Sequence, residues 1–210
     1  DDFLSEFVNG QRKSGGVLYG DAEVLPTPET APKLPISPYG VSKLAGEHAL
    51  RALAALRGFE GVAMRYANVF GPGQEPKSEA GVVSIFVSQL LAGQPLTVFG
   101  EGSQTRSFCY VDDLIRGIVA LAESDVHTPV NIGNPDEFTL LELAKTVIEV
   151  TDSRSEIVYE ALPTDDPQQR RPDIGRARDL LSWEPAVKLD EGLRRTIEQS
   201  GVERLVGAAD

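Results

Sequence analysis

Tyr39 and Lys43 are the residues of this chain whose types and spacing best suit chemistry. On a helix, their i, i+4 spacing places both side chains on one face, where the lysine ammonium favours ionisation of the phenol. An unperturbed tyrosine has a pKa near ~10, so a tyrosine that acts as a base at pH 7 needs that pKa lowered by about 3 units. One lysine in water does not achieve this, and a second positive charge in a site closed to water is required. The pair predicts a proton-transfer site, although an exposed surface pair has the same spacing.

A helix over residues 38–57 is expected to carry this pair. Ser37 is suited to cap the helix, Pro38 fits its first position, and Gly58 ends it. Beyond it, helices and strands alternate as in an α/β protein. We expect strands at 61–66, 96–99, 107–110, 130–132 and 157–160, and helices at 81–92, at 112–122 with Asp112 as cap, at 139–150 with Thr139 and Glu142 as a capping box, and from about 173 and 189.

Composition limits the classes of partner. The 210 residues are 41% hydrophobic and carry a net charge of −12, so a real core is possible, while nucleic acid or an anionic membrane is not expected as the main partner. Cys109 is the single cysteine and lies in an apolar stretch, which indicates a buried small hydrophobe in a reducing compartment. No apolar run approaches the ~20 residues of a membrane span and no signal peptide is visible. We therefore expect a cytoplasmic protein, and we expect no metal site.

Further motifs accompany the Tyr39/Lys43 pair in a fixed order. They are SGGVLYG at 14–20, RYANVFGP at 65–72, GSQTRSFCYVDDL at 102–114 and NIGN at 131–134. With this order and spacing, residues 13–200 resemble the extended short-chain dehydrogenase/reductases that act on nucleotide sugars, the NAD-dependent epimerase/dehydratase family. The resemblance implies an enzyme with a Rossmann-like, doubly wound parallel sheet, a smaller C-terminal α/β part that binds the substrate, and NAD as cofactor. In such a site, oxidised nicotinamide supplies the second positive charge beside the tyrosine.

One part of the family pattern is missing from this sequence. Family members open with a strand, a glycine-rich turn and a helix that holds the dinucleotide pyrophosphate, but no G-x-x-G-x-x-G precedes Ser14. We therefore expect a partial Rossmann-like domain that lacks most of its N-terminal half. Residues 1–12 stay unassigned, 13–132 are assigned to the rest of the NAD-binding domain, and 133–210 mainly to the substrate-binding part, with interleaved boundaries.

The resemblance also assigns roles around the reacting sugar. Tyr39 would remove the proton of the sugar 4-hydroxyl, and Lys43 would lower the pKa of Tyr39 and bind the nicotinamide ribose. Ser14 matches the serine or threonine that hydrogen-bonds the same hydroxyl, with a simple turn serine as the alternative. Tyr66 and Ala67 would pass close to the nicotinamide.

A second group of residues would hold the nucleotide of a UDP-sugar. Asn68 would donate to the diphosphate, and Arg106 would grip it with a planar, permanently charged fork. A turn asparagine and a solvated loop arginine are the alternatives. The base would lie on the strand Thr97, Val98 and Phe99. Ile85 departs from the pattern, because many relatives carry an asparagine that contacts phosphate there.

Two features of the sequence favour different reactions. Segments 102–113 and 165–174 look most like UDP-glucuronate decarboxylases, yet decarboxylases and 4,6-dehydratases place a carboxylic residue just after the Ser/Thr. This chain has Gly15 and Gly16 there, as in a group of 4-epimerases. We therefore predict a UDP-hexose 4-epimerase first, and a decarboxylase or dehydratase second. A non-catalytic fragment or sugar-nucleotide-binding remnant is the alternative of another class. The parent enzyme is expected to be a homodimer.

Overall fold

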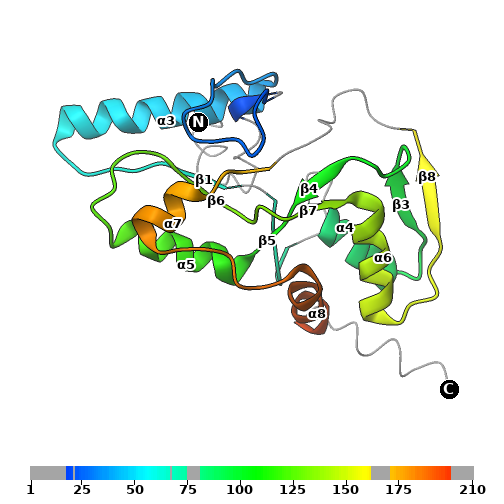
Figure 1. The fold of residues 1–210 in the computed structure, drawn as a ribbon. Coiled ribbons are helices and arrows are strands. Elements are labelled where there is room, and N and C mark those ends of the chain that lie inside the picture. The colour runs from blue at the N-terminus through cyan, green and yellow to red at the C-terminus, as the bar shows by residue number, and fades with distance from the viewer. Residues whose placement is uncertain (1–17, 21, 67, 75–80, 162–170, 200–210) are drawn as a thin grey trace, which may run out of the picture.

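The computed structural model describes residues 18–20, 22–66, 68–74, 81–161 and 171–199. Helices are interspersed with single strands and short runs of strands along these residues (Figure 1). In chain order they are α3 (Pro38–Arg57), β1 (Met64–Tyr66), β2 (Val69–Phe70), α4 (Val82–Leu91), β3 (Leu96–Phe99), β4 (Thr105–Ser107), β5 (Cys109–Tyr110), α5 (Val111–Ala122), β6 (Val130–Ile132), β7 (Glu137–Thr139), α6 (Leu140–Thr151), β8 (Ile157–Glu160), α7 (Gly175–Leu181) and α8 (Leu189–Gln199).

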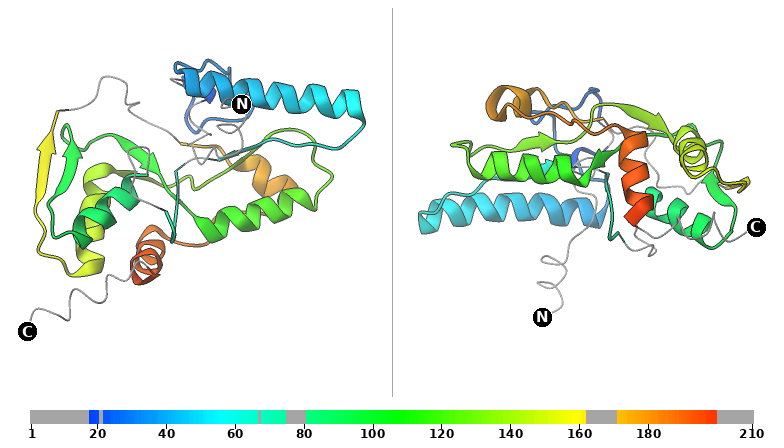
Figure 2. Two further views of the ribbon diagram at one scale, coloured as in Figure 1. Left: turned by 180° about the vertical axis from the view of Figure 1, so that it is seen from behind. Right: turned by 90° about the horizontal axis from the view of Figure 1, so that it is seen from below.

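Most of the strand pairing is parallel, which confirms the α/β class. β1 pairs with β6, β2 with β5 and β3 with β8 in parallel, whereas β4 and β7 are antiparallel. Parallel strands need crossover connections, and helices supply them here. α3 lies on one side of the β1–β6 pair, and α5 and α7 lie on the other (Figures 1 and 2). The layering is that of a Rossmann-like domain.

The helix that carries the expected base has the predicted limits. The Ser37 hydroxyl accepts a hydrogen bond from the Gly40 N–H at 3.1 Å, and Pro38 occupies the first turn, where no N–H partner is needed. At the other end Gly58 adopts φ +70° and donates its N–H to the Ala54 carbonyl at 2.9 Å. Local signals at both ends therefore determine how α3 begins and ends.

Two expectations around residues 107–113 were wrong. The single strand expected at 107–110 is divided into two, because Ser107 pairs antiparallel with Glu137 while Cys109 pairs parallel with Val69. Asp112 does not cap α5, since Tyr110 occupies the N-cap without a side-chain hydrogen bond and Asp112 lies in the first turn. By contrast, the capping box at the start of α6 is confirmed.

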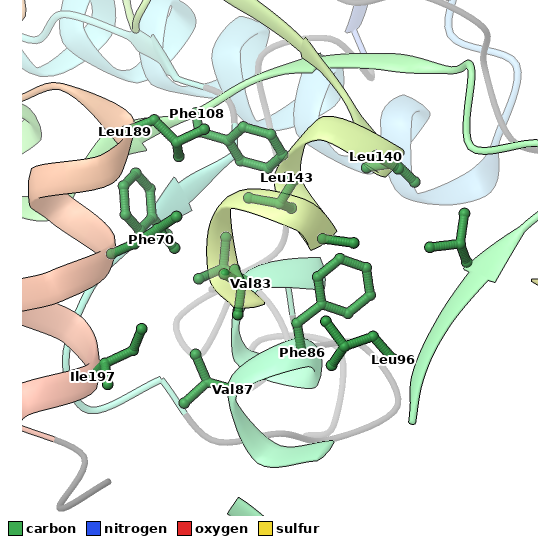
Figure 3. Packing of buried hydrophobic residues seen from close by; sticks show 14 of the residues in the cluster. Phe70, Val83, Phe86, Val87, Leu96, Phe108, Leu140, Leu143, Leu189 and Ile197 are labelled. Atoms are coloured by element: carbon green, nitrogen blue, oxygen red, sulfur yellow. The ribbon is translucent and has the colours of Figure 1, made fainter. Parts of the chain in front are cut away.

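Apolar side chains form two clusters that follow the layers. The larger packs α4, α6 and α8 against β3, and Figure 3 shows Phe86, Leu143 and Leu96 at its centre. The smaller lies between the β1–β6 pair and helices α5 and α7. It includes Cys109, as predicted, and burial raises the pKa of this thiol to about 12, so the thiol stays protonated at neutral pH.

Each of the two clusters contains residues from both sides of residue 132 in the sequence. α7 follows residue 132 in sequence, yet it packs against β6 and α5. α4 and β3 precede residue 132, yet they belong to the other cluster. No single cut point separates the two clusters. A division of the chain into two domains between residues 132 and 133 therefore remains a proposal, and it describes the packing only approximately.

Asp113 anchors the chain between α7 and α8 to α5. Its buried Oδ2 accepts hydrogen bonds from the N–H groups of Ala186 and Val187 at 3.1 and 2.9 Å. The Asp113 carbonyl accepts another from the Trp183 indole at 3.0 Å, and Arg116 pairs with the second carboxylate oxygen. One buried carboxylate thus joins residues about 70 positions apart in sequence.

Candidate active site

The Tyr39 and Lys43 side chains lie on one face of α3, as their spacing predicts. The Lys43 Nζ atom is 5.2 Å from the centroid of the Tyr39 ring, a cation–π distance. Both residues are half-buried. Lys43 has no carboxylate partner among the described residues, so its ammonium is not committed to an ion pair within that part of the chain. The arrangement suits a phenol and an ammonium that both contact a ligand.

A cavity of about 470 Å³ opens near the carboxyl end of β1. Its wall is formed by the β1–β2 connection, the start of α4, β3 and β4. Residues expected from the sequence to contact cofactor or substrate line it together: Tyr66, Asn68, Thr97, Phe99 and Arg106. A cavity of this size is in the usual range for small-molecule sites.

Asn68 is held in an unusual backbone conformation at the edge of this cavity. Its φ is +44°, a left-handed value that few non-glycine residues adopt and that asparagine tolerates best. The Asn68 carbonyl accepts a hydrogen bond from the Cys109 N–H at 3.1 Å, which fixes the backbone between β1 and β2. The Asn68 Nδ2 atom is buried and has no hydrogen-bond partner among the described residues. An orphaned donor in a cavity wall fits a ligand acceptor.

Arg106 and the start of α4 also line the cavity. The Arg106 side chain is buried and lines the cavity, and its Nη1 donates to the Thr105 carbonyl at 2.7 Å. The first turn of α4 also faces the cavity, and its N-cap Gly81 provides no side-chain hydrogen bond. An arginine and a helix N-terminus that line one cavity favour an anion such as a phosphate group.

β3 presents alternate residues to the cavity. Thr97 and Phe99 line it, whereas Val98 is only 1% exposed and packs into the larger apolar cluster. The Val98 side chain therefore does not line the cavity, and only its backbone is available for the expected contact with a base. Gln89 was missed from sequence: its amide donates to the Thr97 hydroxyl at 3.1 Å and accepts from the Thr97 N–H at 3.2 Å.

The remaining expected site residues have different placements. Ser14 and Ala67 lie outside the described residues, so their roles stay predictions. Tyr39 and Lys43 do not line the cavity; they come from α3, on the side of β1–β6 away from α5 and α7 (Figures 1 and 2). Ile85 lines the cavity, so this part of the wall is apolar at the position where the resemblance implies an asparagine.

A buried polar network joins α3 to β1. Arg65 donates from Nε and Nη2 to the two carboxylate oxygens of Glu47, at 2.9 and 2.6 Å. Its Nη1 donates to the Tyr19 hydroxyl at 2.7 Å and to the Glu29 carbonyl at 3.0 Å. The Tyr19 hydroxyl in turn donates to Asn131 on β6 at 3.1 Å, and burial raises the pKa of Tyr19. No local sequence pattern indicated this network.

The described residues include no group of His, Cys, Asp or Glu that could hold a metal ion. Among the same residues, no helix is long and apolar enough to cross a membrane.

Comparison with known proteins assigns the chain to a family. The model of the NAD dependent epimerase/dehydratase family matches residues 14–133. UDP-glucuronic acid decarboxylase 1 of Danio rerio is 44% identical over 186 residues, which are 86% of this chain and 44% of that protein. The chain thus spans less than half the length of this relative.

Solved structures show the same fold. UDP-glucose 4-epimerase of Thermotoga maritima, with UDP-glucose, has a TM-score of 0.86 at 36% identity and covers 97% of this chain and 67% of its own. UDP-glucuronic acid 4-epimerase of Bacillus cereus, with UDP-glucuronic acid and NAD, has a TM-score of 0.81 at 31% identity and covers 91% and 60%. The motifs, the fold and these matches together show that the chain belongs to the NAD-dependent epimerase/dehydratase family.

Proposed function

We propose that this chain is the substrate-binding and proton-transfer part of an NAD-dependent enzyme that oxidises a UDP-sugar transiently at C4. One observation carries the proposal: residues expected to contact the sugar nucleotide, from β3, β4 and the β1–β2 connection, line one cavity. Arg106 and the N-terminus of α4 suit the diphosphate, the Asn68 amide suits a phosphate oxygen, and Thr97 and Phe99 suit the base.

The residues of α3 perform the proton transfer in this proposal. Tyr39 takes the proton of the 4-hydroxyl as C4 loses its hydride, and it returns a proton to the 4-oxygen when the hydride comes back. Lys43 stabilises the phenolate and, lacking a carboxylate partner among the described residues, is available to a ribose hydroxyl of the cofactor. NAD would supply the hydride acceptor when bound, and Tyr66 is the described residue expected to contact its nicotinamide.

The first candidate activity is UDP-hexose 4-epimerisation. Gly15 and Gly16 follow Ser14 in the sequence, where elimination or decarboxylation chemistry uses a carboxylic residue. Small residues leave room for the 4-keto sugar to rotate, so that the hydride returns to its other face. The second candidate is UDP-glucuronate decarboxylation, which is favoured by the 44% identity to the Danio rerio decarboxylase.

Product analysis distinguishes the two candidates. The test protein is the full-length enzyme, here meaning this chain joined to the N-terminal glycine-rich half that the family resemblance implies. With NAD, we expect it to interconvert UDP-glucose and UDP-galactose and to release no carbon dioxide from UDP-glucuronate. Release of carbon dioxide with formation of a UDP-pentose would establish the second candidate instead. Inactivity toward both substrates would refute the proposal.

Arg106 provides a test of the diphosphate site. Replacing it with methionine removes charge-assisted hydrogen bonds, each contributing about 1.5–3 kcal/mol, so UDP affinity should fall roughly 10- to 100-fold. Isothermal calorimetry with UDP measures the loss. Arg178 is an exposed arginine paired with Glu184 at 3.3 Å, and Arg178→Met is the matched control that should bind UDP normally. Equal affinities of the two variants for UDP would show that Arg106 does not bind the diphosphate.

We also propose a homodimer that forms through α3. This helix exposes Val41, Leu53 and Leu56, which lie with small residues along one stripe. A second copy of the same helix would cover this apolar surface. Leu53→Glu should shift the full-length enzyme from dimer to monomer in light scattering, and an unchanged molar mass would place the contact elsewhere.

A further inference from the structure

We propose that Glu47 and Arg65 are positioning residues, which hold the Tyr39–Lys43 pair at a fixed place relative to the sugar site. The inference rests on the proposed function, because it concerns how the base of that reaction is held. Neither residue was expected from sequence to have a part in the site, and neither lines the cavity.

Glu47 is the only residue of α3 with a buried side chain. Apart from it, only Gly40 of this helix is buried, and glycine has no side chain to pack. Tyr39, Lys43 and Glu47 follow one another at i, i+4 spacing, so the anchor lies on the same face of the helix as the pair that it holds. The position of the helix face that carries Tyr39 and Lys43 therefore depends strongly on the contacts of Glu47.

Arg65 meets Glu47 with matched geometry. The two hydrogen bonds of 2.9 and 2.6 Å form a bidentate pair, and the Arg65 and Glu47 side chains are only 2% and 8% exposed. Arg65 is itself held by the Tyr19 hydroxyl and the Glu29 carbonyl. Because the Arg65 guanidinium is held by these partners, its pairing with Glu47 fixes the distance of α3 from β1 and the rotation of α3 about its axis.

β1 connects this anchor to the cavity. Arg65 immediately precedes Tyr66 and lies three positions before Asn68, and both of these residues line the cavity. The Glu47–Arg65 pair thus links the helix of the base to the strand that leads into the substrate wall. A displacement of about 1 Å between a base and its substrate can cost ~10²-fold in rate.

A buried ion pair is weak evidence for a role in stability. Its desolvation offsets most of its attraction, and replacing both partners with apolar residues is often neutral for stability. Glu47→Leu combined with Arg65→Met therefore removes the anchor without leaving an unpaired charge. The Glu29 carbonyl loses its hydrogen bond from Arg65, so we expect a modest loss of stability in a variant that still folds. No residue of α3 lines the cavity, so loosening the helix should displace the base and leave the nucleotide site intact.

The test compares this double variant with the wild-type full-length enzyme. We expect a cooperative thermal transition at a slightly lower temperature, a KM for the UDP-sugar within about threefold, and a kcat lowered roughly 10- to 100-fold. With substrate deuterated at C4, the isotope effect on kcat should rise, because the chemical step becomes slower. A loss of folded protein lowers the rate and leaves the isotope effect unchanged. Glu47→Gln, which keeps part of the hydrogen bonding, should be intermediate.

Amide hydrogen exchange gives a measurement that needs no turnover. In the double variant, exchange in residues 40–47 should accelerate about tenfold or more, while α6 stays as in the wild type. Removal of the exposed Arg178–Glu184 pair, by Arg178→Ala, is the control and should change neither exchange nor rate.

Unchanged kcat and unchanged exchange in the double variant would overturn the inference, as would a rate loss with an unchanged isotope effect. An inactive wild-type enzyme would refute the proposed function instead. The exchange measurement would then still decide whether Glu47 and Arg65 anchor α3.

Discussion

Tyr39→Phe is expected to lower the turnover of the full-length enzyme by about 10²–10⁴-fold. The substitution keeps the ring that Lys43 covers at 5.2 Å and removes only the proton acceptor. The residues proposed to hold the nucleotide line the cavity and Tyr39 does not, so most of the affinity for the UDP-sugar should be kept and the loss should appear in kcat. Steady-state kinetics and calorimetry with UDP-sugar measure the two quantities separately.

Tyr159→Phe is the matched control for this substitution. Tyr159 lies on β8, is 58% exposed and does not line the cavity, so its replacement should leave kcat unchanged. Lys43→Met should also lower kcat and move its pH dependence upward, because the phenolate loses its nearby cation. Full activity of Tyr39→Phe would contradict the assignment of α3 as the catalytic helix.

Asp113→Ala is expected to give the largest loss of stability among the substitutions that we predict. It removes the acceptor of the Ala186 and Val187 N–H groups, and two hydrogen bonds to a charged group correspond to roughly 3–6 kcal/mol in the free energy of unfolding. Urea denaturation of the full-length enzyme measures the change. Asp112→Ala is the neighbouring control, since Asp112 has an exposed side chain and forms a 3.6 Å ion pair with Arg195. Equal midpoints for both variants would show that Asp113 does not anchor the chain between α7 and α8.

The parts of the fold that the sequence predicted well are those with local signals. Ser37, Pro38 and Gly58 determine the limits of α3 within a few residues of each end, and Thr139 determines the start of α6 in the same way. β2 and β7 were not predicted, because each has only two or three residues and depends on a partner that lies about 30 to 40 residues away.

In the candidate site too, features with local sequence signals were predicted and those that depend on distant partners were not. The motifs indicated the residues that meet at the cavity, because a motif marks each residue by its neighbours in sequence. Within the 97–99 segment, however, the pleat turns Val98 away from its two neighbours, and the motif treated the three alike. Glu47 and Arg65 were missed because their pairing spans 18 positions and joins a helix to a strand. Nothing near either residue in the sequence indicates the other.

The most direct test of the central claim follows a single hydrogen. The full-length enzyme with NAD is given UDP-glucose deuterated at C4, and the product is analysed by NMR and mass spectrometry. Transient oxidation at C4 predicts UDP-galactose that keeps the deuterium on C4 with inverted configuration, and no net NADH. Loss of the deuterium to solvent, or inversion at another carbon, would contradict the proposed oxidation at C4 with Tyr39 as the base.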